Sequence, residues 1–255
     1  RARFKGWSDA VADRFGGIID RDRGLECARL ILDFQQEMHR QIEARRMTPI
    51  DDLLSDLVNA ELDGERLTDG QLMSILQQLM VAGNETTTTT IVQAMILLIR
   101  HPAIMRRVRD DFTQIPKMIE EVLRLETPAQ SIWRRALRDT ELGGMVIPAG
   151  AQIMGRVAAA NLDPMVFDDP MTFDIDRRNL YKHLAFGAGI HTCVGNMLAR
   201  KELAISFEEL LSRLSNLAFA PDYVPHYPPH LIVRSPTSLA ITFRGRASQD
   251  DTADG

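Results

Sequence analysis

The chain has 255 residues, of which 45% are hydrophobic and 25% charged, with a formal net charge of −5. This composition is that of a globular protein with a large core, and the negative charge gives no reason to expect nucleic acid as a partner. The two cysteines, Cys27 and Cys193, lie far apart in the sequence, so we expect no disulfide framework and a reducing, cytoplasmic setting. No apolar run reaches the length of a membrane span, so no membrane partner is evident.

The first half of the chain predicts a series of helices. Apolar residues recur three or four positions apart, and this spacing places Cys27 in a core stripe. Thr68 and Gln71 have the spacing of a capping box, and two later helices begin with proline, which a first turn tolerates. The expected helices cover residues 25–44, 51–62, 68–101, 102–111 and 116–126.

The pattern changes after Pro128. Residues 141–150 predict a strand, a turn at Pro148-Ala149-Gly150 and a return strand, and residues 161–182 are an Asp- and Pro-rich meander. A helix over 196–214 and short β segments over 231–243 follow, and the polar residues 246–255 are expected to be disordered. The prediction is one mainly α domain with a small β region over residues 1–245.

One cysteine lies in a glycine-punctuated loop that an amphipathic helix follows directly: Phe186-Gly187-Ala188-Gly189-Ile190-His191-Thr192-Cys193-Val194-Gly195. The glycines allow a tight backbone and a close approach to a flat ligand. The N-terminus of the helix favours the thiolate form of Cys193, which is a strong donor to a soft metal. A zinc site formed with His191 is a poor alternative, because zinc prefers four ligands and no other cysteine lies nearby.

An acid and a hydroxyl lie in the middle of the long predicted helix. Residues 82–90 read Ala-Gly-Asn-Glu followed by five threonines. Glycine and β-branched threonine weaken a helix, so a local break is expected there, and the apolar run over 79–83 argues against a surface position. A local break next to an acid and a hydroxyl, here Glu85 and Thr86, is what an oxygen pocket would need.

These motifs resemble those of the cytochrome P-450 superfamily. The cysteine loop fills every specified position of the family's haem-binding pattern, Phe-x-x-Gly-x-(Arg/His)-x-Cys-x-Gly, and residues 82–86 match (Ala/Gly)-Gly-x-(Asp/Glu)-Thr. Residues 121–124 match the Glu-x-x-Arg helix, and the motifs follow one another in the family's order. The chain is identified as the larger C-terminal part of a soluble, bacterial-type member, with residues 4–11 similar to a mid-chain helix and the N-terminal part missing.

The resemblance implies haem b (iron protoporphyrin IX) with Cys193 on the iron. It also implies that Glu85 and Thr86 are catalytic residues that organise protons, which a carboxyl and a hydroxyl can relay with ordered water. It implies a structural ion pair of Glu121 with Arg124, which a meander residue closes; Arg177 is the candidate. For one propionate it indicates Arg134, with Arg135 as the alternative because only one of two strand neighbours faces the haem. The other residues that it implies are His191 on the second propionate, Phe186 beside the thiolate, Gly187 and Gly195 in the loop, and an apolar substrate pocket of Val81, Ala82, Ala129, Ile132, Ile232 and Val233.

The implied reaction is insertion of one oxygen atom of O2 into a hydrophobic small molecule. Electrons would come from a ferredoxin and a ferredoxin reductase, and Arg200 and Lys201 are weak candidates for the docking face. A non-catalytic haem-binding or sensor module is an alternative, but it would need neither Glu85 nor Thr86, and a peroxide-using variant would be expected to lack that pair. A further alternative is a truncated chain that is inactive by itself. The sequence leaves the substrate open.

Overall fold

The computed structural model describes residues 2–245, and helices make up about 54% of it, which confirms the mainly α class. Its contacts form two compact units that adjoin in the sequence between Glu85 and Thr86. They are called here the N-terminal unit and the C-terminal unit. The single domain over residues 1–245 stays a prediction, and the expected disordered tail at 246–255 lies outside the described residues.

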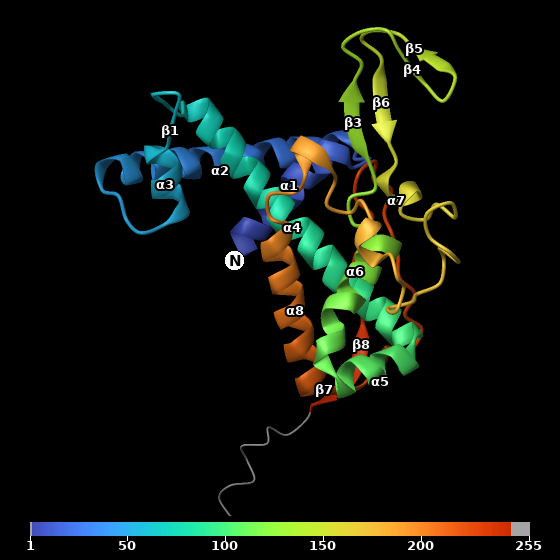
Figure 1. The fold of residues 1–255 in the computed structure, drawn as a ribbon. Coiled ribbons are helices and arrows are strands. Elements are labelled where there is room, and N and C mark those ends of the chain that lie inside the picture. The colour runs from blue at the N-terminus through green and yellow to red at the C-terminus, as the bar shows by residue number, and fades with distance from the viewer. Residues whose placement is uncertain (1, 246–255) are drawn as a thin grey trace, which may run out of the picture. The chain divides into compact units, whose positions relative to one another are not determined.

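The N-terminal unit is helical (Figure 1). Helix α2 is longer than the predicted 25–44 at both ends. It begins at Arg21 because the carboxylate of Asp20 caps it by accepting a hydrogen bond from the Arg23 N–H at 2.8 Å. The capping box is confirmed: Gln71 Oε1 accepts from the Thr68 N–H at 2.8 Å, and Thr68 Oγ1 accepts from the Gln71 N–H at 3.3 Å. The elements are α1 (Ala2–Gly16), α2 (Arg21–Met47), α3 (Leu53–Asn59), β1 (Glu61–Leu62), β2 (Glu65–Arg66) and the first half of α4 (Asp69–Arg100).

Two apolar clusters hold the N-terminal unit together. Trp7 of α1 packs with Phe34 of α2 and Met80 of α4, and the Trp7 and Phe34 rings meet edge to face with centroids 5.5 Å apart. A second cluster joins α2, α3 and α4 through Ile42, Val58 and Leu72. Cys27 is buried on α2, which confirms that it is a core residue.

Asp52 caps α3 and supplies a pH-dependent part of the stability. Its carboxylate accepts hydrogen bonds from Arg45 Nε at 2.9 Å and from the Ser55 N–H at 2.8 Å. The Arg45 bond first, and then the Ser55 bond, lower the pKa of Asp52 to about 2 from an ordinary 3.8. Because the folded pKa lies below the unfolded value, this stabilisation is complete above about pH 4 and disappears as the pH falls towards 2.

We therefore expect Asp52→Asn to flatten the pH dependence of unfolding between about pH 4 and pH 2. Urea unfolding followed by circular dichroism across that range measures the effect. The adjacent exposed Asp51, changed to Asn, is the matched control and should keep the wild-type slope. Equal slopes in both variants would contradict the assignment.

The C-terminal unit combines helices with short antiparallel strand pairs (Figure 1). Its core lies where α6 packs against α8, with Met118, Ile119 and Val122 of α6 and Phe207 and Leu211 of α8 all buried. The strands pair as β3 with β6, β4 with β5, and β7 with β8. The elements are α5 (Pro102–Asp110), α6 (Ile115–Leu125), α7 (Val157–Ala160), α8 (Asn196–Arg213), β3 (Ile132–Arg135), β4 (Thr140–Leu142), β5 (Met145–Ile147), β6 (Gln152–Gly155), β7 (Leu214–Phe219) and β8 (Ile241–Gly245), with single 3-10 turns at Phe112–Gln114, Leu180–Lys182 and Gly189–His191.

The turn predicted at Pro148-Ala149-Gly150 is present, with the Ala151 N–H donating to the Pro148 carbonyl at 3.1 Å, but the two strands of the hairpin pair across a different turn. The chain reverses between β4 and β5 at Gly143 and Gly144, whose φ angles are +59° and +78°. Two consecutive residues with positive φ form the tight turn that suits a two-residue hairpin, and glycine adopts it without strain. The segment 148–150 instead leads into β6, which pairs with β3.

Helix α4 is continuous from Asp69 to Arg100, so the predicted local break is wrong. Thr90 Oγ1 donates to the carbonyl of Thr86 at 2.8 Å, which satisfies the hydroxyl within the helix. Met80 is buried, but Ala82 and Gly83 are exposed, contrary to the burial expected for 79–83. With about 3.6 residues per turn, five consecutive residues cannot all face one core.

Among the described residues, no single helix is long and apolar enough to cross a membrane. Helices α4 and α5 meet the length and composition limits only together, and they are bent by 109° at their junction.

Candidate functional site

The cysteine loop is a tight turn directly before α8. The Cys193 N–H donates to the Phe186 carbonyl at 2.8 Å and closes the loop. Gly187 has a φ of +71°, and a Cβ on it would lie 3.2 Å from the His191 carbonyl oxygen, so this position requires glycine. On the other side, Asn196 Nδ2 donates to the Cys193 carbonyl at 2.7 Å. These bonds hold Cys193 in front of the first turn of α8.

Apolar residues surround an exposed sulfur in this loop. The Cys193 side chain is exposed, and a Cβ on Gly195 would lie 3.9 Å from its Sγ, so Gly195 is next to the sulfur. Ile190 and Val194 are 97% and 91% exposed, and Met197 of α8 is also exposed. A thiolate donor within an apolar surface fits the iron and the flat apolar ring of haem. The residues present therefore fit haem b.

The basic candidates for the propionates lie on β3 and in the loop. Arg134 and Arg135 are neighbours on β3, opposite Ile153 and Gln152 of β6, and both are exposed. Arg134 Nη1 donates to the carbonyl of the neighbouring Trp133 at 2.8 Å. His191 ends a 3-10 turn and is exposed. The assignment of Arg134 and His191 to propionates stays a prediction.

The acid of the acid–threonine pair is held within the N-terminal unit. Ser8 Oγ of α1 donates to Glu85 Oε1 at 3.1 Å and accepts from Asn84 Nδ2 at 3.0 Å. Burial raises the pKa of Glu85 above its ordinary value, although the Ser8 hydrogen bond acts in the opposite direction. Glu85 is thus a half-buried acid with a fixed carboxyl oxygen, and Thr86 follows it on α4. Nothing in the sequence pattern singled out Ser8.

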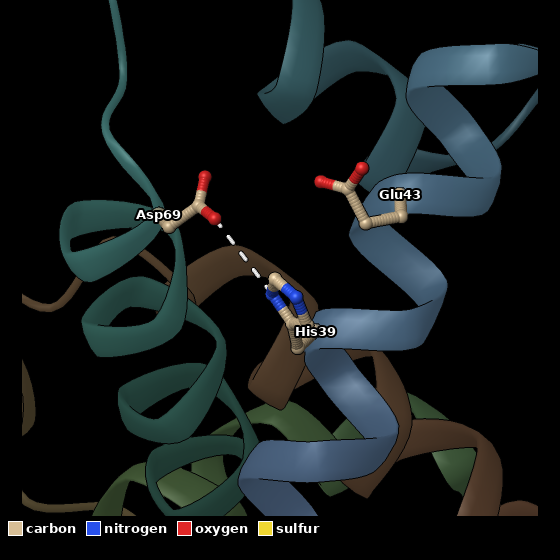
Figure 2. A group of neighbouring side chains, drawn as sticks. All are labelled: His39, Glu43 and Asp69. Carbon is tan, nitrogen blue, oxygen red and sulfur yellow. Dashed lines mark ion pairs between the residues drawn. The ribbon is translucent and has the colours of Figure 1, made fainter.

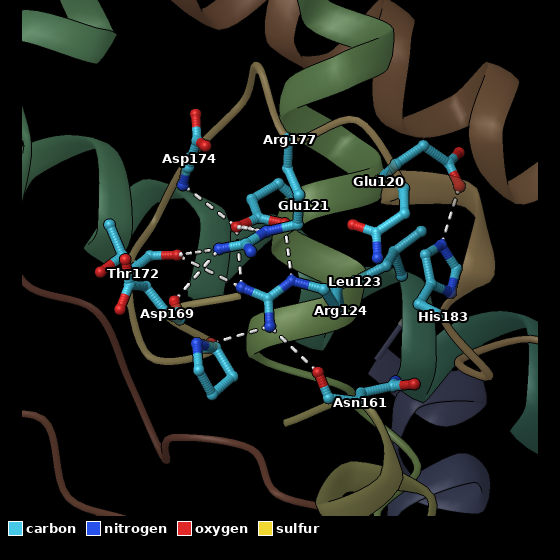
Figure 3. A network of polar contacts seen from close by, with 12 residues as sticks. Glu120, Glu121, Leu123, Arg124, Asn161, Asp169, Thr172, Asp174, Arg177 and His183 are labelled. Carbon is cyan, nitrogen blue, oxygen red and sulfur yellow. Dashed lines mark hydrogen bonds and ion pairs between the residues drawn. The ribbon is translucent and has the colours of Figure 1, made fainter. Parts of the chain in front are cut away.

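Glu121 and Arg124 form a completely buried ion pair on α6 (Figure 3). Arg124 Nε lies 2.7 Å from Glu121 Oε2, and Nη2 lies 2.8 Å from Oε1. The remaining N–H groups donate to backbone carbonyls: Nη1 to Asn161 at 3.0 Å and to Pro170 at 2.8 Å, and Nη2 to Thr172 at 3.2 Å. All the donors of the guanidinium fork are therefore used.

Arg177 of the meander closes this network, as the resemblance implied. Its Nε lies 3.3 Å from Glu121 Oε1, and its Nη2 donates to the Thr172 carbonyl at 3.1 Å. Glu121 Oε1 also accepts from the Asp174 N–H at 3.0 Å. Figure 3 shows Arg177 and Arg124 converging on the same carboxylate. The network thus fastens the irregular meander to α6.

A second buried acid, Glu120, was not singled out from the sequence. Its Oε2 lies 2.8 Å from His183 Nε2, and its Oε1 accepts from Arg200 Nε at 2.6 Å. Figure 3 shows the contact between Glu120 and His183. Both partners also contact Phe186 of the cysteine loop, so α6, the loop and α8 are joined. Adjacent acids at 120 and 121 were the only sequence sign of this arrangement.

The predicted pocket residues fall into two groups. Ala129 and Val233 form an antiparallel bridge, and the Gln130 N–H donates to the Ile232 carbonyl at 2.6 Å, so the structure brings these two segments together. Ile132 follows on β3 and is 40% exposed. Val81 and Ala82 lie on the part of α4 that belongs to the N-terminal unit.

A separate cluster in the N-terminal unit has the side-chain types of a cation site (Figure 2). His39 and Glu43 lie one turn apart on α2 and face Asp69 at the start of α4, with His39 Nδ1 3.7 Å from Asp69 Oδ2. All three are exposed, and Arg46 pairs with both carboxylates. Because Arg46 already balances these charges, the cluster is a surface ion-pair group.

Comparison with known proteins agrees with this geometry. The family described as Cytochrome P450 matches residues 25–242. The chain is 44% identical over 171 residues to cytochrome P450 109 of Bacillus spizizenii, covering 67% of this chain and 42% of that protein. It is 38% identical to the steroid C26-monooxygenase of Mycolicibacterium smegmatis, covering 93% of this chain and 59% of that protein. The structure of cytochrome P450 CYP109Q5 from Chondromyces apiculatus superposes with a TM-score of 0.86 at 37% identity, covering 97% of this chain and 60% of that one.

The chain thus spans about half the length of the curated relatives that it matches. The matched region nevertheless contains the cysteine loop, the acid–threonine pair and the buried Glu121–Arg124 pair, in one continuous alignment with the family. The chain belongs to the cytochrome P450 family.

Proposed function

We propose that the protein is a cytoplasmic haem-thiolate monooxygenase that inserts one oxygen atom of O2 into a hydrophobic small molecule. Its electrons come from a separate ferredoxin and ferredoxin reductase. The observation that carries the proposal is the Cys193 loop, where the backbone presents an exposed sulfur within an apolar surface.

Each residue of the loop region has a distinct part in holding the cofactor. Cys193 supplies the thiolate, and the ring of Phe186, the first residue of the loop, packs beside the thiolate and limits access of water to it. Arg134 and His191 provide positive or hydrogen-bonding partners for the two propionates. When bound, the haem supplies the activation of dioxygen and the oxidising chemistry.

Glu85 and Thr86 control the protons. Burial keeps the pKa of Glu85 above its usual range, so its carboxyl is closer to a protonated state at neutral pH than an exposed glutamate. Ser8 fixes one carboxyl oxygen of Glu85. The Thr86 hydroxyl then passes the proton towards dioxygen through ordered water.

The residues proposed for the substrate pocket favour an apolar substrate. They offer no charge to a ligand: Val81, Ala82, Ala129, Ile132, Ile232 and Val233. A relative is named as a steroid C26-monooxygenase, and the name of that protein is consistent with a hydrophobic substrate class for this chain.

The test is how the variants Glu85→Gln and Thr86→Val use electrons. We expect product formed per electron pair to fall by about 10- to 100-fold in each, with the electrons recovered as hydrogen peroxide, because proton delivery is misdirected. NADPH consumption, peroxide and product are measured together with surrogate redox partners and a panel of apolar substrates.

Thr88→Val is the matched control, because Thr88 is an exposed threonine of the same run. It should keep the wild-type partition between product and peroxide. A different result would favour a haem-binding or sensor module. In that case the wild-type protein binds haem through the thiolate but oxidises none of the substrates, and Glu85→Gln changes neither NADPH consumption nor peroxide formation.

A further inference from the structure

Arg200, seven residues after Cys193 on α8, is fixed by a buried acid of α6. Its Nε lies 2.6 Å from Glu120 Oε1, and its Nη2 lies 3.0 Å from Oε2, so the guanidinium binds the carboxylate through two hydrogen bonds. Its Nη1 also donates to Asn196 Oδ1 at 2.9 Å, at the start of α8. A side chain held in this way is not free to reach out to a docking partner.

The same guanidinium lies against the cysteine loop. Its Cζ is 4.4 Å from the centroid of the Phe186 ring, a cation–π distance. The His183 ring, which also binds Glu120, has its centroid 6.1 Å from that of Phe186. The backbone carbonyl of Phe186 in turn accepts the Cys193 N–H at 2.8 Å. One short chain of contacts therefore runs from Glu120 through Arg200 and Phe186 to the cysteine.

The two ends of the ion pair carry opposite charges close to this loop. Burial alone would raise the pKa of Glu120, but hydrogen bonds from His183 and Arg200 more than offset it, so its pKa lies below its ordinary value and it is a carboxylate. Hydrogen bonding to Glu120 raises the pKa of Arg200, and the negative charge of the Cys193 thiolate acts in the same direction. Arg200 is thus a permanent cation that interacts electrostatically with Cys193, the proposed iron ligand.

We propose that Arg200, held by Glu120, is a positioning residue for the haem-thiolate site. Its guanidinium fixes the ring of Phe186 at the start of the cysteine loop. Its charge, balanced by that of Glu120, sets how readily the site accepts an electron. This inference rests on the proposed function. One-electron reduction adds a negative charge to the site. A nearby cation favours that change and a nearby carboxylate opposes it.

The test is the one-electron reduction potential of the haem-loaded protein, measured by spectroelectrochemical titration at one fixed pH. Arg200→Met leaves Glu120 unbalanced and should shift the equilibrium constant against reduction by about tenfold, or about 59 mV. Glu120→Gln leaves Arg200 unbalanced and should shift it about tenfold in favour of reduction. The double variant should return close to the wild-type value.

Lys201→Met is the matched control, because Lys201 is the next residue on α8 and is exposed. Water screens the charge of Lys201, so the equilibrium constant for one-electron reduction should change by less than about twofold. Arg200→Lys keeps the charge but not the planar fork, and should restore most of the potential that Arg200→Met loses.

Opposite shifts in Arg200→Met and Glu120→Gln support the proposal, because mere loosening of the loop would move both potentials the same way. Shifts of one sign, or none, overturn it. If Arg200→Met does not retain haem, Glu120→Gln decides alone, and a potential at or below the wild-type value overturns the proposal. A wild-type protein without a thiolate-type carbon monoxide spectrum would instead overturn the proposed function.

Discussion

Cys193→Ser is expected to abolish the thiolate-type spectrum of the haem-loaded protein. In the reduced, carbon-monoxide-bound wild type, we expect a Soret band strongly shifted to the red of that of histidine-ligated haem. A serine hydroxyl is a hard, protonated donor at neutral pH and cannot replace the thiolate on iron. The absorption spectrum with and without carbon monoxide, recorded on both proteins after reduction with dithionite, measures the effect.

Cys27→Ala is the matched control, since Cys27 is the other cysteine of the chain and is buried on α2. It should keep the red-shifted band while lowering the free energy of unfolding by about 1 kcal/mol, because a small cavity replaces the sulfur. Survival of the band in Cys193→Ser would disprove the ligand assignment. Loss of the band in Cys27→Ala, with the band retained in Cys193→Ser, would disprove that assignment as well.

The parts of this site that the sequence predicted are local ones. The cysteine loop is continuous in sequence, and its glycines, its closing bond from Cys193 to Phe186 and the start of α8 all follow from neighbouring residues. Glu121 and Arg124 lie one helical turn apart, so a side-chain pair between them is a local event. The addition of Arg177 came from the resemblance, because the periodicity of the meander gives no sign of it.

The parts that the sequence did not predict depend on distant partners. Ser8 and Glu85 are 77 positions apart, and Glu120 and Arg200 are 80 apart, so only the packing of helices decides that they meet. The hairpin turn at Gly143 and Gly144 was missed for a different reason. Pro148-Ala149-Gly150 does form a turn, as predicted, but the hairpin closes at the two adjacent glycines, whose positive φ angles match the twist of a two-residue hairpin.

Arg124→Met is expected to cost about 3–5 kcal/mol in the free energy of unfolding. The change leaves the carboxylate of Glu121 buried without its main partner, since Arg177 contributes only a longer contact of 3.3 Å. It also removes the Arg124 donor from the carbonyls of Asn161 and Pro170, and one of the two arginine donors from the carbonyl of Thr172. Urea unfolding followed by circular dichroism measures the loss, which is a large fraction of the 5–15 kcal/mol that is typical of a folded protein.

Arg213→Met is the matched control, because Arg213 pairs with Glu209 on the surface of α8 with both side chains more than half exposed. Water and salt screen that pair, so its loss should cost less than about 1 kcal/mol. The double variant Glu121→Leu with Arg124→Met removes the unbalanced carboxylate. It leaves the carbonyls of Asn161 and Pro170 without their Arg124 donor, and it leaves Arg177 Nε and the Asp174 N–H without the carboxylate that accepts from them. Each unsatisfied buried group costs about 1–3 kcal/mol.

The double variant should therefore stay well below the wild type in stability, although an isolated buried ion pair can be replaced by apolar residues at little cost. Recovery to the wild-type free energy of unfolding would show that Arg124 acts only through Glu121. A persistent loss would show that the contacts of this network to the meander, and not the ion pair by itself, supply most of the stability.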